Sequence, residues 1–532
     1  MKPGTTDKSR CKEATQKRKD RAAEIANTFE WLITAFMLAF VFRAFVMEAF
    51  RIPTGSMADT LKGAHWQLGC TQCGYQYAYN FGGQQVPNYD VPIESGSPWC
   101  PSCGYYLPRD TERLAANGDR ILVLKCIYQF FEPKRWDVVV FKNPSEPWEN
   151  FIKRLVARPG ETVEIIDGDI YIDGQIARKP PKIQQELWMP VYDNDYQPVR
   201  PDLRRFNGHR WQQPFRNKAG SKWDFNAPDP TVFKLESDVD DIHVMFYDTN
   251  LGNNFGAENC AYNPNRENNR PPYCSDLMVR FYTNLSEQKG VVGIGLSKYG
   301  RRYKAQVDAA GAMTIAKSDN GTEWIELANE QIERPELNKP VLVKFINVDH
   351  QLIFQFGDET LTYDLGVDPE AAGSVNGNIE PEVRIFGSGK QELSHIAIFR
   401  DTYYTAPLQQ GGGFASAGRP FKLEPGEFFV LGDNSPASHD SRLWSKKGIG
   451  VNGKPLYRPG IVPHDYLVGK ALFVYWPSGF EFPWPQGLKT YLKNGWENRN
   501  RLSAIMYWAV TLRWIPNIGQ MRFIYGGSNK NH

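Results

Sequence analysis

Ser56 is the first residue whose type and position suit nucleophilic chemistry. It lies in residues 51–61, where Pro53 and Gly55 predict a turn that presents the serine hydroxyl just after an apolar run. A serine in such a turn acts as a nucleophile when a base lies beside it. The alternative is that Ser56 only shapes the turn, which is the commoner use of serine next to glycine and proline.

Lys153 is the candidate base. It lies in residues 150–160, an apolar segment that is predicted to form a short strand. With the two-residue alternation of a strand, Phe151 and Leu155 share its face, so we expect the amine to be buried. Burial disfavours the charged amine and lowers its pKa toward neutrality, as a general base requires. The alternative is an edge-strand lysine whose amine is solvated.

A third segment, residues 428–444, begins as an apolar strand and continues into a loop rich in hydroxyl and carboxylate side chains. Hydrogen bonds from such a loop can orient a base. The same residues can equally form a turn whose Asp and Asn side chains cap the backbone.

In this order, the three segments resemble the sequence boxes of bacterial type I signal peptidase, also called leader peptidase. Residues 52–61 resemble its serine box, 151–161 its lysine box and 432–442 its Gly-Asp-Asn box. The resemblance implies that Ser56 is the nucleophile and Lys153 the general base. It also implies further roles: the Ser56 amide and the Thr54 hydroxyl form the oxyanion hole, Ser438 bonds the lysine amine, and Asp433, Asp440 and Arg442 hold the third loop.

The chain departs from the family pattern at a few positions. Asp59 stands where the family has proline, Ala157 and Glu161 replace glycine and aspartate, and residues 435–437 replace an Arg-Asp-Asn run. None of these changes removes the serine, the lysine or a hydrogen-bond donor. They bear on efficiency and loop stability rather than on the type of reaction.

The resemblance also extends to the strands that must position these residues. Residues 118–125 and 135–144 resemble the paired strands of the family, and 164–175 resemble its hairpin with Asp-Gly turns. Residues 469–477 resemble its closing strand. We therefore expect a β catalytic domain.

Two Cys-x-x-Cys-Gly turns contain Cys70, Cys73, Cys100 and Cys103. Each turn presents two thiolates on one side, so this spacing predicts a zinc ribbon that holds one structural Zn²⁺. Two disulfides are the alternative, favoured by an oxidising exterior. A zinc-dependent hydrolase is disfavoured because four thiolates leave no open coordination position and no His-Glu-x-x-His motif is present.

The N-terminus indicates a membrane anchor. Residues 1–26 carry eight Lys and Arg against four acidic residues, and residues 29–50 form a window of 22 mostly apolar residues. That length is close to the roughly 20 residues that a helix needs to cross a bilayer. The positive charge places residues 1–26 in the cytoplasm and the chain after residue 50 outside. A cleaved signal peptide and a buried amphipathic helix are the alternatives.

Residues 186–415 separate the lysine box from the Gly-Asp-Asn box, which is called the third box below. They are predicted to form an all-β insert. Short apolar strands with Gly, Asn and Asp turns predict a sandwich similar to the jelly rolls of concanavalin and laminin-G type. Cys260 and Cys274 are spaced so that they could pair, and residues 409–414 predict a flexible linker. The insert's role is open between glycan binding, a scaffold and substrate gating.

The C-terminal residues 500–532 are interpreted as an interfacial or docked segment.

Length and composition bound these interpretations. A chain of 532 residues is expected to fold as two or three units. Lys and Arg total 62 against 60 Asp and Glu, so the net charge of +2 gives no argument for a nucleic-acid partner. Eight cysteines are too few for a disulfide scaffold of this length.

The sequence thus predicts a mainly β protein with six parts. These are a basic tail (1–28), a transmembrane anchor (29–50), a catalytic domain in two pieces (51–185 and 416–499), a zinc-ribbon-like insert (66–110), a β-sandwich insert (186–415) and the C-terminal segment (500–532). The predicted function is a single-pass serine endopeptidase of the inner membrane that removes signal peptides from preproteins on the extracytoplasmic side, without a catalytic cofactor. The alternative is a membrane-tethered binding or scaffold protein with an inactive protease framework, whose insert binds glycan or protein.

Overall fold

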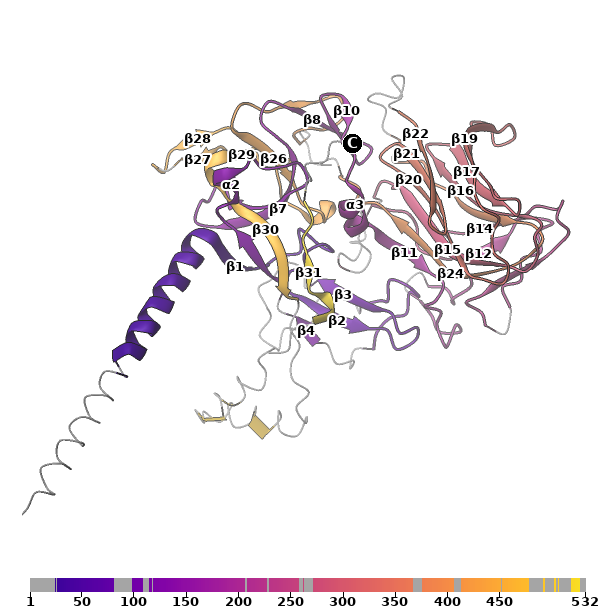
Figure 1. Cartoon of the computed structure of the whole chain (residues 1–532), viewed down its shortest axis with the longest axis horizontal. Coiled ribbons are helices and arrows are strands. Elements are labelled where there is room, and N and C mark those ends of the chain that lie inside the picture. The colour runs from indigo at the N-terminus through magenta and orange to yellow at the C-terminus, as the bar shows by residue number, and fades with distance from the viewer. Residues whose placement is uncertain are drawn as a thin grey trace, which may run out of the picture.

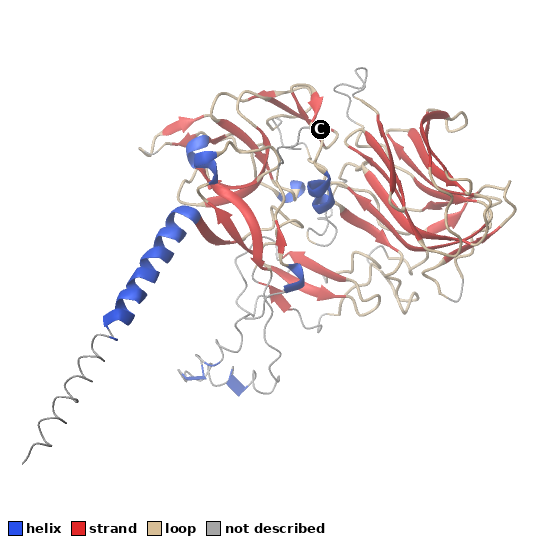
Figure 2. Cartoon of the chain, in the orientation of Figure 1, coloured by secondary structure: helices blue, strands red, loops and turns tan. Residues whose placement is uncertain are grey.

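The computed structural model describes residues 24, 26–80, 98–108, 114–116, 118–205, 208–226, 229–257, 262, 271–366, 376–405, 413–450, 452–477, 491–492, 502–503, 506 and 518–526. Strands dominate the body, and one long helix near the N-terminus projects away from it (Figure 1; Figure 2). The prediction of a mainly β protein with one apolar N-terminal helix is confirmed.

The largest sheet follows the order β1-β5-β30-β6-β7-β26-β29, with β31 paired to β30. Its strands are β1 Met47–Arg51, β5 Arg120–Leu124, β6 Val138–Lys142, β7 Asn150–Ala157, β26 Glu427–Leu431, β29 Val462–Pro463, β30 Leu467–Trp476 and β31 Arg522–Phe523. The two halves of the chain that flank the insert therefore meet in one sheet. The pairing of β7 with β26 brings the lysine segment beside the start of the third box.

The expected direct pairing of residues 118–125 with 135–144 is wrong. β30 lies between β5 and β6 and pairs antiparallel with both. Ala471 and Val474 of β30 are fully buried. The central position between two strands therefore stabilises β30 by removing apolar side chains from water. A strand pattern predicts that a strand exists, but not which distant segment will lie beside it.

A smaller sheet with the order β10-β9-β8-β25 adjoins the large one (Figure 1). It consists of β8 Thr162–Ile166, β9 Asp169–Ile172, β10 Gln175–Ile176 and β25 Phe421–Lys422. The turn between β8 and β9 is Asp167-Gly168, and both residues have positive φ, which matches the Asp-Gly hairpin turn that the sequence predicts.

The N-terminal helix spans Ala26–Val46 and ends in the π-helical turn η1, Phe42–Val46. Its 21 residues are long and apolar enough to cross a membrane. The expected span of 29–50 is wrong at its C-terminal end, because Met47–Arg51 forms β1 and pairs with β5 from Met47↔Leu124 onward. The Glu48 carboxylate lies 3.1 Å from the Lys125 amine, so the acidic residue of the predicted span lies in the sheet.

The cysteine segment forms a three-stranded sheet with the order β3-β2-β4. Its strands are β2 His65–Gly69, β3 Gln76–Asn80 and β4 Leu114–Ala116. The first Cys-x-x-Cys turn lies between β2 and β3.

The insert contains two seven-stranded sheets, seen on the right in Figure 1. The first has the order β11-β24-β15-β20-β21-β22, with β13 on β24. Its strands are β11 Met189–Asp193, β13 Phe233–Glu236, β15 Leu277–Leu285, β20 Val341–Val348, β21 Gln351–Phe356, β22 Glu359–Asp364 and β24 Lys390–Arg400. The second, β12-β14-β23-β16-β17-β18-β19, has β12 Phe215–Asn217, β14 His243–Tyr247, β16 Val291–Lys298, β17 Arg301–Asp308, β18 Ala312–Ser318, β19 Ile325–Gln331 and β23 Val383–Gly387.

Apolar side chains from both sheets share one buried core, which includes Phe281, Ile294, Phe345 and Ile385. This arrangement is compatible with the predicted sandwich. The structure adds strands that the sequence pattern missed, among them β19 and β22. Both are largely exposed, so their polar side chains hide the alternation that marks a half-buried strand.

A buried ionic cluster joins the insert to the smaller sheet. The Lys298 amine of β16 contacts the carboxylate of Asp276 and lies 3.4 Å from that of Asp169 in β9. Lys179, which precedes helix α3 (Pro181–Leu187), lies 2.9 Å from Asp401. Because each amine meets carboxylates at low exposure, the cluster fixes the insert against β9 and α3.

At the C-terminal end, residues 518–526 dock on the large sheet through β31, and the Ile524 amide donates to the Leu472 carbonyl at 2.9 Å. Residues 1–23, Cys260 with its expected pairing to Cys274, residues 409–412 of the expected linker, and residues 507–517 lie outside the described residues.

Candidate active site

The Lys153 amine donates a hydrogen bond of 2.6 Å to the Ser56 hydroxyl. Lys153 comes from the middle of β7, and Ser56 from the turn that follows β1. Both are buried, with 4% and 8% of their surface exposed. The structure thus brings together the two residues that the sequence singled out, although they lie 97 positions apart.

Burial lowers the pKa of Lys153 to about 8, against the opposing effect of the nearby Asp440 and Asp433 carboxylates. The positive charge of Arg442 lowers it further. A pKa near 8 leaves about a tenth of the amine neutral at pH 7. A neutral amine beside a serine hydroxyl can accept the proton of that hydroxyl.

The serine turn is held from the third box by Asn434. Its side-chain amide donates to the Gly55 carbonyl at 2.8 Å, and its backbone amide donates to the Ser56 carbonyl at 3.1 Å. The Ser56 amide makes no hydrogen bond within the described part of the chain, and Thr54 lies exposed two residues before it. The turn therefore keeps one backbone donor next to the nucleophile available.

The third box forms a closed loop around a buried ion pair. Asp440 accepts hydrogen bonds from the Arg442 guanidinium at 2.7 and 2.9 Å and from the Gly432 amide at 3.0 Å. The Arg442 guanidinium also donates to the Thr405 carbonyl at 2.6 Å and to the Ser435 hydroxyl at 2.7 Å. These bonds lower the pKa of Asp440 against the effect of burial, so a fixed negative charge lies near Lys153.

Ser438 lies at the centre of this loop. It is buried, and a Cβ built on Gly432 would lie 2.2 Å from its hydroxyl and 2.4 Å from the Ser56 carbonyl oxygen. Only glycine at position 432 leaves room for both. The Ser438 hydroxyl forms no hydrogen bond of good geometry to Lys153, which bonds Ser56 and the Ile152 carbonyl.

Arg154 is a residue whose role the sequence did not reveal. Its guanidinium donates two hydrogen bonds of 2.7 Å to Asp433 and one of 3.0 Å to the Trp136 carbonyl, and it is fully buried. The strand alternation places it on the face opposite Lys153, and a buried arginine needs a carboxylate partner. The need of a buried arginine for a carboxylate could therefore have pointed to Asp433 of the third box as its partner.

Tyr262 of the insert is a second residue that sequence reasoning missed. It is fully buried and packs with Ala58 and Ala78, between the serine turn and β3. A Cβ on Gly55 would lie 2.1 Å from its ring. The insert therefore reaches the turn that holds the nucleophile, and no sequence pattern signals this contact.

The four cysteines of the two turns form one cluster. The Cys70 and Cys103 sulfurs lie 3.7 Å apart, and the Cys73 and Cys100 sulfurs 3.6 Å apart. A disulfide requires about 2 Å, so all four thiols are free. Four sulfurs at about 2.3 Å from a tetrahedral Zn²⁺ would lie about 3.8 Å from one another, so the cluster fits this ion.

The two turns have the same backbone. The amides of Gly74 and Gly104 donate to the carbonyls of Cys70 and Cys100 at 2.9 and 2.8 Å. Both glycines have positive φ, of 76° and 74°, which side chains rarely adopt. The glycine after each Cys-x-x-Cys pair thus allows the turn that directs two thiols to one point.

Residues 109–209 and 390–476 match the model of the family "Signal peptidase, peptidase S26". The chain contains a peptidase S26 domain. The match to this domain includes Lys153 and the third box and is interrupted by most of the insert, and Ser56 lies before it.

Curated relatives share parts of this domain. The signal peptidase I of Rickettsia canadensis (strain McKiel) is 27% identical over 27% of this chain and 42% of its own length. The probable signal peptidase I-1 of Synechocystis sp. is 38% identical over 13% of this chain and 40% of its own. The signal peptidase I of Aquifex aeolicus (strain VF5) is 55% identical over 9% of this chain and 18% of its own length. The chain spans less than half the length of these relatives.

Solved structures resemble part of this chain only distantly. A carbohydrate-binding module, CBM66 from Bacillus subtilis, covers 35% of this chain and 95% of its own at 11% identity and a TM-score of 0.24. Sheep galectin-11 covers 24% and 92% at 10% identity and a TM-score of 0.19.

Proposed function

We propose that this chain is a membrane-anchored serine endopeptidase that uses Ser56 and Lys153 to remove signal peptides from exported preproteins. The observation that carries the proposal is the 2.6 Å hydrogen bond between these two buried side chains. The S26 domain supports the same reaction class. A framework that had lost its activity would have no need to keep a buried lysine of lowered pKa beside a serine.

The reaction begins with the neutral Lys153 amine, which accepts the Ser56 proton while the hydroxyl oxygen attacks the carbonyl carbon of the scissile bond. The resulting ammonium then donates the proton to the leaving amine, and an acyl group remains on Ser56. Water, activated by the same amine, releases this acyl group and restores the serine. Because burial is the main cause that lowers the pKa of the amine to about 8, no histidine is needed.

The oxyanion of the tetrahedral intermediate is assigned to two donors, the Ser56 amide and the Thr54 hydroxyl. The amide is available in the serine turn, and a hydroxyl donor two residues earlier reproduces the family's chemistry. Asn434 positions this turn, since it bonds the carbonyls of Gly55 and Ser56. Asp433, Asp440 and Arg442 act on Lys153 by fixing the loop behind it, and Ser438 is buried within that loop.

The helix Ala26–Val46 anchors the enzyme, with the basic tail in the cytoplasm and the S26 domain outside the inner membrane. The five-residue strand β1 leads from the helix to the serine turn. A dyad this close to the membrane surface suits a substrate whose own apolar helix lies in the bilayer.

The cysteine cluster is proposed to hold one structural Zn²⁺ through Cys70, Cys73, Cys100 and Cys103. When bound, the ion contributes folding free energy, because four thiolates leave no position for a substrate. Around it, the Val199 amide donates to the Gln72 carbonyl at 2.9 Å, and Asn253 donates to the Pro101 carbonyl. Each of the two cysteine turns is thereby bonded to the insert.

The test is cleavage of a model preprotein by the purified full-length chain in detergent, with mass spectrometry of the products. We expect one cut. The first and third residues before the cut should have small side chains. The Ser56→Ala chain, matched in detergent and zinc content, is the control. Equal cleavage by this variant would assign the activity to a contaminant and would leave the binding-protein alternative standing.

A further inference from the structure

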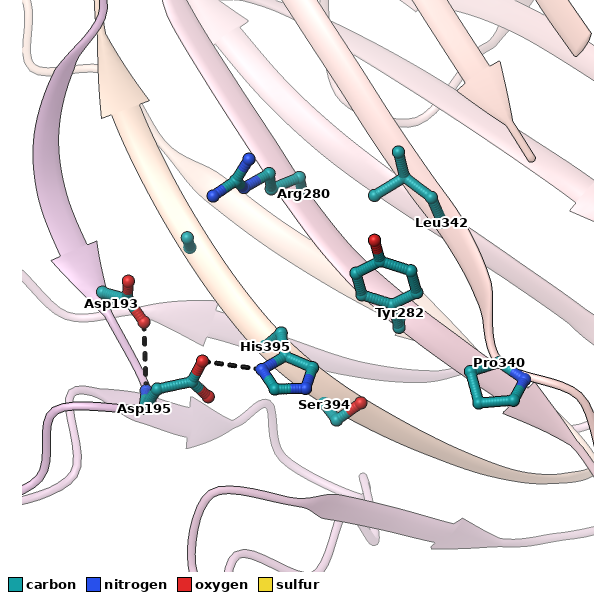
Figure 3. A pocket seen from close by; sticks show the side chains of 9 residues that line it. Asp193, Asp195, Arg280, Tyr282, Pro340, Leu342, Ser394 and His395 are labelled. Carbon is teal, nitrogen blue, oxygen red and sulfur yellow. Dashed lines mark hydrogen bonds and ion pairs between the residues drawn. The ribbon is translucent and has the colours of Figure 1, made fainter. Parts of the chain in front are cut away.

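An open cavity of about 550 Å³ lies on the outer face of the first sheet of the insert, and neither Ser56 nor Lys153 lines it (Figure 3). Its volume falls within the roughly 300–1,000 Å³ that is typical of small-molecule sites. Asp193 and Asp195 line it from the end of β11, Arg280 and Tyr282 from β15, and His395 from β24. Figure 3 shows these side chains on one face of the sheet.

A β-bulge gives this face its shape. Arg280 of β15 pairs with Ala397 of β24 and Tyr282 pairs with Ser394, so His395 and Ile396 together lie opposite one residue. His395 has a φ of 53°, an uncommon value for a residue with a side chain, while Ile396 stays in the core. Bulges re-aim side chains, and strained backbone of this kind concentrates at functional sites.

The re-aimed imidazole is held in place. His395 Nδ1 lies 2.7 Å from Asp195 Oδ2, and Asp193 in turn accepts a hydrogen bond of 3.1 Å from the Asp195 amide. The Tyr282 ring lies edge-on to the imidazole, with 5.9 Å between ring centroids. The hydrogen bond of Nδ1 leaves Nε2 as the ring nitrogen available to a ligand.

The polar groups of the cavity carry charges of both signs and both donors and acceptors. Asp193 and Asp195 offer acceptors and two negative charges, while Arg280 offers donors and one positive charge. The Arg280 guanidinium is steadied over the Phe399 ring, 5.0 Å from its centre. A site that carries both signs of charge favours a neutral ligand, because either sign of charge on the ligand would meet a like charge.

Tyr282 and Leu342 add an apolar surface beside these groups. Tyr282 keeps 40% of its surface exposed although it belongs to a central strand. An exposed ring next to paired donors and acceptors matches a ligand that has one apolar face and several adjacent hydroxyls. Among common ligands, a pyranose or furanose ring has this chemistry.

We propose that this cavity binds a neutral saccharide, with Tyr282 stacking on the sugar ring and Asp195, His395 and Arg280 bonding its hydroxyls. The site gives the insert a ligand-binding activity of its own. This binding does not depend on peptide-bond cleavage, since neither Ser56 nor Lys153 lines the cavity.

The test uses the full-length Ser56→Ala chain in detergent, so that its result is independent of proteolysis. The labelled chain is applied to an array of neutral and acidic oligosaccharides, and calorimetry measures the affinity for the neutral oligosaccharide that retains it. Retention on at least one neutral oligosaccharide is expected. Retention by none, or by acidic oligosaccharides alone, would overturn the proposal.

Variants of the cavity then locate the binding. Tyr282→Ala and Asp195→Ala should each weaken binding at least tenfold, and Tyr282→Leu, which keeps apolar volume without the ring, should weaken it similarly. The matched control is Trp324→Ala, because Trp324 is a partly exposed aromatic residue next to β19 of the other sheet. Thermal unfolding verifies that each variant is folded. Unchanged binding in folded Tyr282→Leu and Asp195→Ala chains would place the ligand elsewhere and refute the site.

Discussion

The Arg154 guanidinium and the Asp433 carboxylate form a fully buried pair joined by two hydrogen bonds of 2.7 Å. Arg154 follows Lys153 in β7, and Asp433 opens the third box. The pair therefore locks the strand that carries the base to the loop that surrounds it. It also places Asn434 where it bonds the serine turn.

Removal of one partner of this pair should unfold the S26 domain more readily. Asp433→Ala leaves the Arg154 charge buried without a partner, and such losses cost about 3–5 kcal/mol of the free energy of unfolding. Asp364→Ala is the control, because Asp364 pairs with Arg178 at a side-chain exposure of 56% and such pairs contribute about 1 kcal/mol or less. Thermal and urea unfolding measure both. Equal losses in the two variants would show that the buried pair has no special weight.

The pH dependence of cleavage should follow Lys153. Its neutral form is the base, and its pKa is about 8, so kcat/KM should rise with pH and level off above this value. Below pH 7 the rate should fall about tenfold for each pH unit, because the neutral fraction falls by that factor. A pH series of initial rates tests this. A midpoint between 6 and 7 that vanishes in His439→Ala would instead identify a histidine base.

Purified protein should contain about one equivalent of zinc and need no added metal for cleavage. Strong chelation should lower the unfolding temperature, with activity lost only as the fold is lost. Cys70→Ser should remove the metal, whereas Cys126→Ser, at a half-buried cysteine outside the cluster, should retain it. Metal analysis and thermal unfolding provide the readouts. Two intact disulfides without zinc would contradict the assignment and leave the dyad untouched.

Tyr262 should contribute to catalysis by positioning the serine turn. Tyr262→Ala opens a space beside Gly55 and Ala58, and displacement of a nucleophile by about 1 Å can cost roughly a hundredfold in rate. We expect kcat to fall at least tenfold, with KM changed less, and Tyr262→Phe to restore most of it. Trp324→Ala, at an exposed aromatic residue of the same insert, is the control. Wild-type kcat in a folded Tyr262→Ala chain would exclude the positioning role.

Local chemistry was predictable from the sequence, whereas long-range pairing was not. The burial of Lys153 followed from its apolar neighbours in β7, and the hairpin of β8 and β9 followed from its Asp-Gly turn. The cysteine spacing predicted the cluster geometry, because each Cys-x-x-Cys-Gly turn is a local structure. In each case the residues that decide the structure lie within a few positions of one another.

The features that the sequence did not predict depend instead on residues that lie far apart in the chain. The position of β30 between β5 and β6 depends on contacts across more than 300 residues, which no periodicity encodes. The contact of Tyr262 with the serine turn depends on how the insert docks, and the helix ended before residue 47 because a strand partner was available. The bulge at His395 likewise follows from register between β15 and β24 rather than from the local sequence.

The most direct test compares cleavage of one preprotein, with alanine at the first and third positions before the cut, by four full-length chains. The wild type should cleave it, Ser56→Ala and Lys153→Ala should be slower by about a thousandfold or more, and His439→Ala should stay within a few-fold of wild type. His439 is the matched control because it lies in the same loop, exposed and next to Asp440. Cleavage by Lys153→Ala at the wild-type rate, or a His439→Ala chain as inactive as Lys153→Ala, would contradict the serine and lysine dyad.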